Sequence, residues 1–546
     1  MMAKMRKPAS ARSAVVLIAV LMVVFLLTLA AYQYNEMVTS ELRAADSSAN
    51  SVQARALAYS GIYYTAAILG DPNSFQGLLN SNPWDSPSAF QGVLVYTDPK
   101  TGRTGRFTIF SPSDPAENNP QAFRYGLIDE ASKINPNAVL QIDPTGTVLY
   151  NMLMSFAVTD PNMTADIADS IIDWIDSDDD PRPNGAESSY YQGLSPPYRA
   201  KNAPLESVEE LLLVKGVTPQ FLFGTDLNRN WIQDSGEDSG TGWNPGWAAY
   251  LTVYSREQNI DNTGNPRLYL NDTISQTSYS SLSSTLSQAL ANFIVLYRTQ
   301  NGGSTTGGST TTTTTATMTT LPGGNTVVIQ SMTTGGATGR TATSQEISDK
   351  VNEVLSGSSQ NAMQSKSLAS RYDLVNAYVS WTVGTGRDQQ TVRMDSPLND
   401  KSQLSQYLPI LLDKTTTQKS KELPARINVN TAPQMVLAAL PGLTDTDVQS
   451  ILEQRPDTSS MDPTDTTYQT PAWLYTQANI SITKLKALER YITARTQVYR
   501  VQVLGYFDQG GPAVRMEAVI DTNNGYPRIV MVRDLTELGR GLPQSQ

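Results

Sequence analysis

Residues 163–216 read MTADIADSIIDWIDSDDDPRPNGAESSYYQGLSPPYRAKNAPLESVEELLLVKG, a cluster of acids between two helix-like segments. Apolar residues recur at helical spacing in the first segment, at Ile167, Ile171, Trp174 and Ile175. The pattern predicts a helix whose opposite face carries four acids, Asp166, Asp169, Asp173 and Asp176. Pro181 and Pro183 stop the helix, because proline lacks the N–H and its ring fixes φ. The acids therefore crowd the C-terminal end, which the helix dipole makes unfavourable for negative charge.

A divalent cation would offset the repulsion between these acids, and calcium suits a flexible set of carboxylate and carbonyl ligands. We call the candidate ligands of this stretch the acidic cluster: Asp173, Asp176, Asp178, Asp179, Asp180 and Glu187. The alternative is an ordinary acidic loop that faces solvent, which is what most charge runs are.

A second acidic stretch, residues 226–237, matches the spacing of a twelve-residue calcium loop. Oxygen ligands fall at its first, third, fifth, seventh, ninth and twelfth positions, the seventh through a backbone carbonyl: Asp226, Asn228, Asn230, Ile232, Asp234 and Glu237. Trp231 stands where glycine normally permits a sharp turn, so the loop must be distorted. The alternative is a polar turn rich in Asp and Asn. The full match in spacing favours a metal site, and makes this loop the more specific of the two calcium predictions.

Composition excludes several classes of active site. The chain has 546 residues, enough for two or three domains, and neither histidine nor cysteine. Histidine-dependent triads, histidine-ligated zinc and disulfides are therefore absent. The formal net charge of −11 argues against a protein that binds nucleic acid by neutralising phosphates.

The N-terminus predicts a membrane anchor. A basic leader (Lys4, Arg6, Lys7 and Arg12) precedes an uncharged run at residues 14–32, and the first acid is Glu36. The run is at the lower edge for a spanning helix, and the basic flank should stay cytoplasmic. The run continues into an amphipathic helix and lacks the small-residue cleavage site that follows a secretory signal. We therefore expect a retained single-pass anchor in the inner membrane. The bulk of the chain would then lie in the periplasm.

Alternating patterns predict a small sheet made from the two ends of the chain. The predicted strands are 93–96, 106–110, 498–506, 514–521 and 528–533. Two or three strands alone are marginal, so we expect both groups to share one sheet, with the helical sequence between them as a large insertion. Within that insertion, residues 302–345 are rich in Gly, Ser and Thr and predict a linker or surface insertion without order of its own. Residues 207–214 carry the capping-box pattern of a helix start.

Residues 426–455 resemble a helix-hairpin-helix unit, a fold that often binds the DNA backbone through hairpin amides. The hairpin lacks a second glycine, and Asp445 and Asp447 would repel phosphate. We therefore expect a packing unit and no nucleic-acid partner. Two other functions stay open as alternatives: a minor pilin or competence pseudopilin that uses its hairpins on DNA, and a carboxylate enzyme such as a glycosidase built on the acidic cluster, for which no cleft is evident.

Five stretches together closely resemble protein K of type II secretion, the large minor pseudopilin family. They are YGLIDEASKIN (125–135), DWIDSDDDPRPNGAESSYY (173–191), PPYRAKNAPLESVEELLLVKG (196–216), RINVNTAPQMVLAALPGL (426–443) and TQVYRVQVLG (496–505). The basic leader also resembles a type IV prepilin leader, with cleavage between Ser13 and Ala14, although Ser13 replaces the usual Gly. Ile18 would then be the fifth mature residue, where most pilins carry Glu and K-type pseudopilins typically do not.

The resemblance implies an α+β fold: a long N-terminal membrane and pilin helix, and a small pilin-like antiparallel-sheet domain with a large, mainly helical insertion. It implies calcium as cofactor, bound in the insertion. It implies minor pseudopilins I and J, the major pseudopilin, prepilin peptidase and the inner membrane as partners, and a non-enzymatic role in capping or initiating the pseudopilus. We divide the chain into leader (1–13), helix (14–70), first pilin-like part (71–128), first helical part with the acidic loops (129–300), linker (301–347), second helical part with the hairpin unit (348–490) and C-terminal strands (491–546).

Overall fold

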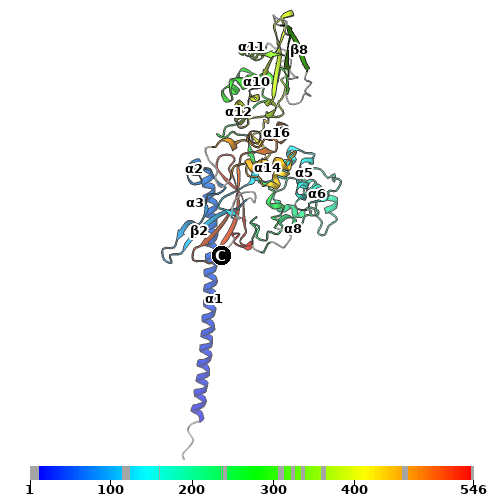
Figure 1. Ribbon diagram of the computed structural model, residues 1–546. Helices are drawn as coiled ribbons and strands as arrows, with labels where there is room; N and C mark the ends of the chain where they lie inside the picture. The colour runs from blue at the N-terminus through cyan, green and yellow to red at the C-terminus, as the bar shows by residue number, and fades with distance from the viewer. Residues whose placement is uncertain are drawn as a thin grey trace, which may run out of the picture.

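A computed structural model shows a long helix that projects from a broad head (Figure 1). The structure describes residues 11–542 apart from 114–122, 159, 161, 235, 238–242, 305–312, 321–325, 334–338, 358–364 and 458–464. Most of the predicted leader, residues 1–10, lies outside the described residues. The predicted α+β class is confirmed: one helix and a small sheet form a pilin-like module, and a mainly helical insertion makes up the rest of the head.

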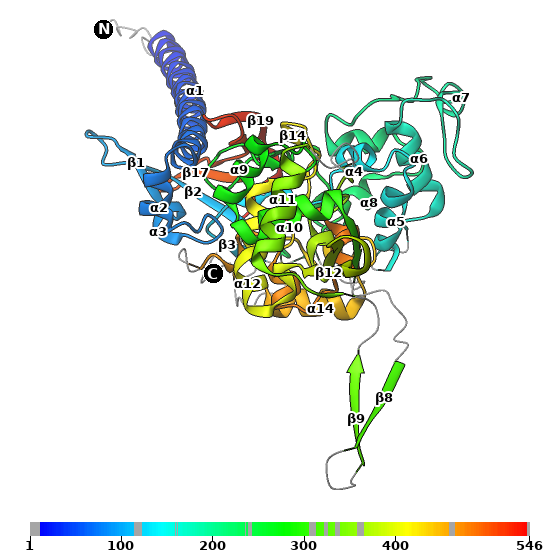
Figure 2. The same ribbon diagram turned by 90° about the horizontal axis from the view of Figure 1, so that it is seen from above.

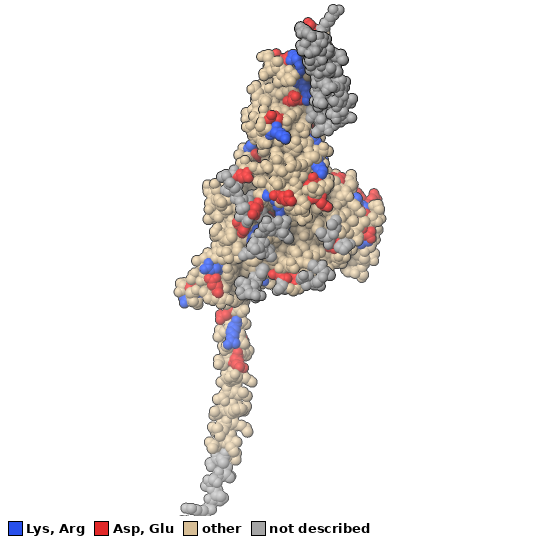
Figure 3. All heavy atoms as spheres, viewed as in Figure 1, with Lys and Arg blue, Asp and Glu red and all other residues tan. Residues whose placement is uncertain are grey.

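Helix α1 spans Ala11–Gly70 and has two different halves. Residues 13–35 carry no charge, and the apolar side chains from Val15 to Leu29 are 44–66% exposed. Mean hydropathy reaches 2.9 over an 18-residue window, so this half is long and apolar enough to cross a membrane. In Figure 3 no charged side chain is visible on the described part of α1 furthest from the head. The helix ends where Asp71 caps the next helix, α2 (Pro72–Leu79), which is followed by α3 (Pro87–Phe90).

The pilin-like sheet joins strands from both ends of the chain, as predicted. Its antiparallel path is β1-β2-β17-β18-β19, with the bounds Val93–Thr97, Thr104–Pro112, Val498–Phe507, Val514–Asp521 and Arg528–Asp534. Two short strands, β3 (Phe123–Arg124) and β4 (Ile128–Asp129), pair with β2 and β17 respectively. The pairing of β2 with β17 closes the module across about 400 residues of chain, with Gln502 opposite Phe110.

One face of this sheet packs against the second half of α1. Leu57, Ala58 and Ile62 of the helix share a core with Val501 and Val503 of β17. Gly505 permits the close approach, because a Cβ there would lie 2.4 Å from the carbonyl oxygen of Ala54. Burial of these side chains is what holds the helix to the sheet.

The opposite face is polar and carries the insertion. Arg500 of β17 forms buried ion pairs with Glu130 (2.5 Å) and with Glu517 of β18 (2.7 Å). Ile232 of the insertion packs on Phe110 and Leu504 of the sheet. The two faces therefore differ in chemistry: apolar burial under α1, and paired charges under the insertion.

The insertion leaves the sheet after β4 and first forms a group of short helices around one core. These elements are η1 (Glu130–Ser132), α4 (Pro136–Ile142), α5 (Thr147–Ser155), η2 (Phe156–Val158), α6 (Ala165–Ile175), α7 (Ser188–Tyr191), η3 (Val208–Leu213), α8 (Pro219–Phe223) and η4 (Trp247–Ala249). In Figure 2 they lie on the side of the head away from α1.

The later part of the insertion combines helices with a four-stranded sheet. Its helices are α9 (Gln276–Thr285), α10 (Gln288–Thr299), α11 (Ser344–Leu355), η6 (Arg371–Leu374), η7 (Gly386–Asp388), η8 (Pro397–Asn399), α12 (Lys401–Lys414), α13 (Gln434–Ala438), α14 (Asp445–Gln454), η9 (Thr467–Gln469), α15 (Trp473–Thr476) and α16 (Ile482–Leu488). The sheet runs β10-β12-β11-β7, with bounds Arg340–Thr341, Gln390–Asp395, Ala377–Val383 and Asn301–Ser304.

Three two-residue ladders tie the parts of the insertion together. They pair β5 (Glu257–Gln258) with β14 (Glu422–Leu423), β6 (Leu268–Tyr269) with β13 (Thr415–Thr416), and β15 (Ile427–Asn428) with β16 (Ile492–Thr493). The last helical turn, η10 (Thr536–Leu538), follows β19 of the pilin-like sheet. The ladders show that residues 257–299, which we placed in the first helical part, pair and pack with the second part.

Two sequence expectations need correction. Residues 302–345 are expected to lack order of their own, but β7 pairs with β11, and β8 (Thr313–Thr320) pairs with β9 (Thr326–Thr333), because β-branched threonines favour strands. The segment 207–214 forms the 3₁₀ helix η3, and Ser207 makes no side-chain cap. Asp169 and Asp173, which the sequence predicts on the helix face opposite the apolar residues, are both buried.

Candidate metal centre

The acidic cluster begins on α6, the helix predicted from its apolar spacing. Thr164 caps the first turn by accepting a hydrogen bond from the backbone N–H of Ile167. The chain turns back after the helix, so that Arg182 reaches Asp169 through an ion pair of 2.8 Å. The backbone N–H of Arg182 also donates to both oxygens of Asp173. Gly185 lies against Asp173 so closely that a Cβ would sit 1.9 Å from Oδ2. Asp169 and Asp173 thus hold the turn that carries the later acids.

Three of the six candidate acids converge at this turn. Asp176, Asp178 and Glu187 each place a carboxylate oxygen within 4.8 Å of the others. Glu187 is 1% exposed, and neither of its carboxylate oxygens has a hydrogen-bond partner. One oxygen of Asp176 and the side-chain oxygen of Asn202 are buried and unpartnered in the same way. Unpaired buried oxygens are costly, so this arrangement fits a hard cation.

The pKa values of the cluster also indicate that negative charge is unfavourable there. Burial, together with the negative charges of Asp173 and Asp176, raises the pKa of Glu187 to about 8. Burial likewise raises the pKa of Asp176 to about 6, with Asp178 and Asp173 adding to the shift. The pKa of Asp173 is raised to about 6 by burial, against the opposing backbone donors. These raised pKa values show that several negative charges are unfavourable here unless a cation lies between them.

The remaining candidates of the acidic cluster have other surroundings. Hydrogen bonds from the side chain and from the backbone N–H of Ser188 lower the pKa of Asp179. Asp180 is exposed and lies outside the converging group. Asn202 was missed by sequence reasoning, because it lies 24 residues beyond Asp178 and donates to the carbonyl of that residue only in the folded chain. The sequence signal that points to it is the stretch PPYRAKNAPLESVEELLLVKG, which resembles the family.

The loop 226–237 brings its predicted ligands together, but its acids are already occupied. Asp226 accepts from the backbone N–H groups of Asn230 and Trp231, and Glu237 accepts from those of Leu227 and Asp234. The side-chain amides of Asn228 and Asn230 both donate to Asp234. Burial raises the pKa of Asp226 to about 6, and the charge of Glu237 contributes.

The predicted distortion at the sixth loop position is present. Trp231 has φ of 59°, the left-handed region that glycine normally occupies, and Arg229 has φ of 54°. The indole of Trp231 lies over the ammonium of Lys133, 3.6 Å from ring centre to nitrogen. Tertiary contacts therefore hold a conformation that the local sequence disfavours.

The loop is also fastened to the pilin-like module. Arg515 of β18 donates to the carbonyl oxygens of Asn228 (2.7 Å) and Arg229 (2.9 Å). Asn230 donates to the carbonyl of Gly541 near the C-terminus at 2.8 Å. For calcium to bind here, Asn228 and Asn230 would have to present their oxygens in place of the amide groups that now contact Asp234. The donor set fits calcium, but the loop is hydrogen-bonded without it.

The hairpin between α13 and α14 has its amides engaged within the protein. The backbone N–H of Thr444 donates to Asp447, whose carboxylate also pairs with Lys484. A phosphate would have to displace this carboxylate. Ser13 and Ala14, the predicted cleavage residues, lie in the first turns of α1, and cleavage there stays a prediction.

The fold is pilin-like: one half of a long helix is apolar enough to cross a membrane, and the other half packs on a small antiparallel sheet whose opposite face carries a large helical insertion. Two models of one family match the insertion: the first domain of type II secretion system protein K over residues 130–223, and protein K again over residues 427–483. Over these two stretches the chain matches the type II secretion protein K family.

Individual relatives match over shorter stretches. The protein K homologue of Escherichia coli (strain K12) is 36% identical over 102 residues, covering 17% of this chain and 31% of the relative. Protein K of Klebsiella pneumoniae is 28% identical over 156 residues, 27% of this chain and 44% of the relative. The chain thus spans less than half the length of these relatives. A chain of the solved GspK-GspI-GspJ complex from enterotoxigenic Escherichia coli aligns over 91% of this chain and 98% of that chain, with 12% identity and a TM-score of 0.37.

Proposed function

We propose that this protein is a minor pseudopilin that caps or initiates the type II secretion pseudopilus and so aids protein transport across the outer membrane. Helix α1 would anchor it in the inner membrane as a single-pass protein, with the head in the periplasm. Prepilin peptidase would cleave between Ser13 and Ala14. Its partners would be the major pseudopilin and minor pseudopilins of the I and J types, the proteins named with GspK in the solved complex.

The observation that carries this proposal is the division of α1. The half from Val15 to Leu29 has no partner within the head and exposes apolar side chains on every side. The other half is packed on the sheet through Leu57, Ala58 and Ile62. A membrane span continuous with a packed helix lets a subunit leave the bilayer and enter a helical bundle without unfolding its head.

The position of the insertion supports a place at the filament end. In Figure 1 the insertion lies beside and beyond the sheet, on the side away from the free end of α1. A bulky head at that end leaves no room for another subunit to stack above it. The proposed mechanism requires no reaction at the head, and the non-enzymatic role is part of the proposal.

Calcium would stabilise this head at the acidic cluster. The ligands that the geometry supports are Asp176, Asp178 and Glu187, with Asn202 as a fourth oxygen donor. The loop 226–237 is the second proposed site. At both, the ion would neutralise like charges that burial has brought together.

Assembly is tested with the full chain co-expressed with the I-type, J-type and major pseudopilins of its own host. We expect a complex with I and J after detergent extraction, and pseudopili that become shorter as the amount of this chain is raised. Filament length that does not depend on its amount would contradict the capping role. Failure to co-purify with I and J would contradict the partner assignment.

Topology and the DNA alternative are tested separately. In spheroplasts, added protease should digest the head, whereas a head protected from protease would place it in the cytoplasm and overturn the localisation.

The purified full chain should not bind duplex DNA at low salt, because Asp447 occupies the hairpin amide. Salt-dependent DNA binding would favour the competence pseudopilin instead.

A further inference from the structure

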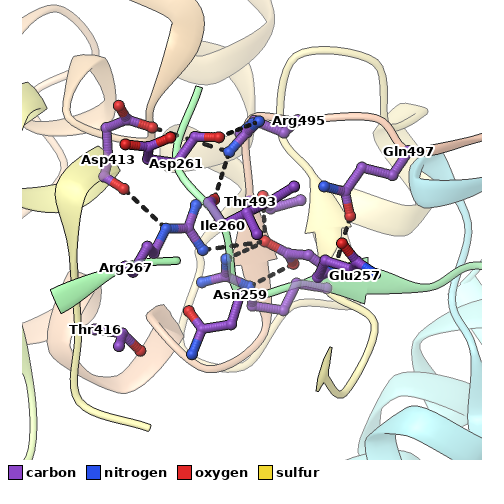
Figure 4. A network of polar contacts seen from close by, with 12 residues as sticks. Glu257, Asn259, Ile260, Asp261, Arg267, Asp413, Thr416, Thr493, Arg495 and Gln497 are labelled. Carbon is purple, nitrogen blue, oxygen red and sulfur yellow. Dashed lines mark hydrogen bonds and ion pairs between the residues drawn. The ribbon is translucent and has the colours of Figure 1, made fainter. Parts of the chain in front are cut away.

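A buried group of arginines and glutamates joins three segments of the insertion. Glu257 lies on β5, Arg267 precedes β6, and Arg426 follows β14, while Arg371 begins η6 and Glu489 follows α16. Figure 4 shows the part of this network around Glu257 and Arg267. The group lies where residues from 257 to 490 meet, far from both acidic sites in the sequence.

Each glutamate in the group has its own arginine. Arg426 binds Glu257 through both Nε and Nη2, and it also donates to the backbone carbonyl of Glu489. Arg371 binds Glu489 through Nε, and its Nη1 donates to the carbonyls of Leu412 and Thr415. Ser370 donates its hydroxyl to the same carboxylate. The negative charges of both glutamates are therefore already matched.

Arg267 is the third arginine of the group, and neither glutamate forms a hydrogen bond with it. Its side chain is 5% exposed, and its nearest carboxylate oxygen, on Glu257, is 3.8 Å away. Its Nε donates to the carbonyl oxygen of Asp413 at 2.9 Å, and neither Nη atom makes a hydrogen bond to any residue that the structure describes. Burial lowers the pKa of Arg267 to about 9; Glu257 opposes this shift, whereas Arg426, Arg371 and Arg495 add to it.

The buried charges do not balance. Three arginines (Arg267, Arg371 and Arg426) face two glutamates (Glu257 and Glu489), and all five side chains are at most 9% exposed. The neighbouring acids Asp261 and Asp413 pair with Lys414, and Asp413 also lies 3.9 Å from Arg495, so the wider group holds five cations and four acids. One positive charge therefore stays uncompensated in a site with little access to water, which is unfavourable.

A small cavity lies at this point. It has a volume of about 20 Å³, and its lining includes Arg267, Arg371, Arg426 and Glu489 together with Thr416 and the exposed Arg490. Such a volume holds about one particle of the size of a water molecule. A phosphate, a sulfate or a substrate carboxylate is too large for it.

We propose that this cavity binds one small monovalent anion, of the size of chloride, against the free Nη atoms of Arg267. The anion supplies the missing negative charge and joins β5, β6 and η6 at their common contact. Glu489, the carboxylate in the lining, is neutralised by Arg371 and Ser370 and does not repel it strongly. The exposed Arg490 leaves a route for exchange with solvent.

The first test compares chloride with gluconate, which cannot enter the cavity. The full chain in detergent micelles is melted in mixtures of the two sodium salts at constant ionic strength and constant calcium. The melting temperature should rise by about 2–5 °C between about 1 mM and about 100 mM chloride, because binding to the folded state alone stabilises by mass action. Bromide should act in the same way. Equal melting temperatures in both salts would overturn the proposal and leave water as the occupant.

The second test uses a matched pair of variants. Arg267→Gln removes the unmatched charge and should abolish the response to chloride. Arg256→Gln removes an arginine with a 59% exposed side chain from the same region but outside the cavity, and should keep the full response. A response that persists in Arg267→Gln would place the anion elsewhere and overturn the assignment.

A third measurement needs no variant. Crystals of the full chain grown in bromide should show an anomalous peak beside the Nη atoms of Arg267. Absence of that peak, with bromide ordered elsewhere in the same crystals, would also overturn the proposal. The test is independent of the secretion role, since it concerns only the folded head.

Discussion

The acidic cluster and the loop 226–237 hold their acids in opposite ways. In the loop, the carboxylates of Asp226 and Glu237 accept four backbone hydrogen bonds, and Arg515 fastens the loop to the sheet. In the cluster, both oxygens of Glu187 are buried without a partner. The loop has the ligand spacing of a calcium site, whereas the cluster has the buried carboxylate oxygens without partners that a calcium ion would need.

The spacing of ligands and the need for an ion are therefore separate properties of the two sites. A loop that satisfies its acids with backbone donors gains less from a cation than a turn that leaves acids facing one another. We therefore expect calcium to contribute more stability at the acidic cluster, although the loop matched the sequence pattern better.

The largest expected effect is that of calcium removal on the cluster. With a chelator at pH 7.5, the melting temperature of the full chain should fall by about 5 °C, the loss expected for an ion bound well above its dissociation constant. The double variant Asp176→Asn with Glu187→Gln should melt below the unmodified protein in calcium but above it in chelator, because amides bind the ion poorly and do not repel. Differential scanning calorimetry measures both.

A matched control is Glu206→Gln, which removes an acid whose side chain is 89% exposed. It should follow the unmodified protein in both buffers. If chelation leaves the melting curve of the unmodified protein unchanged, calcium has no part in the stability of the head.

The second effect is a pH dependence that appears only without calcium. The folded pKa values of Glu187 (about 8) and Asp176 (about 6) lie above their unfolded values, so the folded state holds extra protons between about pH 4 and pH 8. The stability from these groups is complete at the acidic end of this range and is lost as pH rises through the folded pKa values. Urea unfolding in chelator should therefore show stability falling from pH 5 to pH 8, and the double variant should flatten the curve.

A smaller effect is expected in the loop. Glu237→Gln weakens the acceptor for two backbone amides and should cost about 1–3 kcal/mol, nearly the same with calcium as with chelator. Calorimetric titration should show one ion fewer than in the unmodified protein. A cost that disappears in chelator would mean that the ion, and not the backbone network, holds the loop.

The smallest effect is expected at Asp180. This acid is exposed and lies outside the converging group, so Asp180→Asn should change stability by less than about 0.5 kcal/mol and leave calcium stoichiometry unchanged. Loss of a bound ion in this variant would redraw the ligand set of the cluster.

Local patterns predicted the regular parts of the fold because their causes are local. The apolar run after Arg12 predicts the free half of α1, and the alternating strands after Val498 predict the sheet. Patterns failed where a distant segment changed the environment. Helical periodicity placed Asp169 and Asp173 opposite the apolar face, but it says nothing of Arg182, which folds back to pair with Asp169.

At the candidate sites, too, the sequence identified residues whose contacts only the fold shows. The sequence identified all six acids of the cluster but could not separate Asp176, Asp178 and Glu187 from the others, since that choice depends on the turn at Gly185. It also identified the loop and the misfit at Trp231. Only the fold shows that Lys133 and Arg515 hold that misfit in place.

The sequence alone determined the long apolar helix, the class of the fold, the resemblance to protein K and the two acidic stretches, because hydropathy, alternation and residue spacing act over a few turns of chain. The tertiary structure decided which acids meet, which are neutralised, and where the unmatched charge of Arg267 lies. The physical reason is that burial and pairing of charge depend on groups brought together from distant parts of the chain, and such contacts set the energy of a buried ion far more than its neighbours in sequence do.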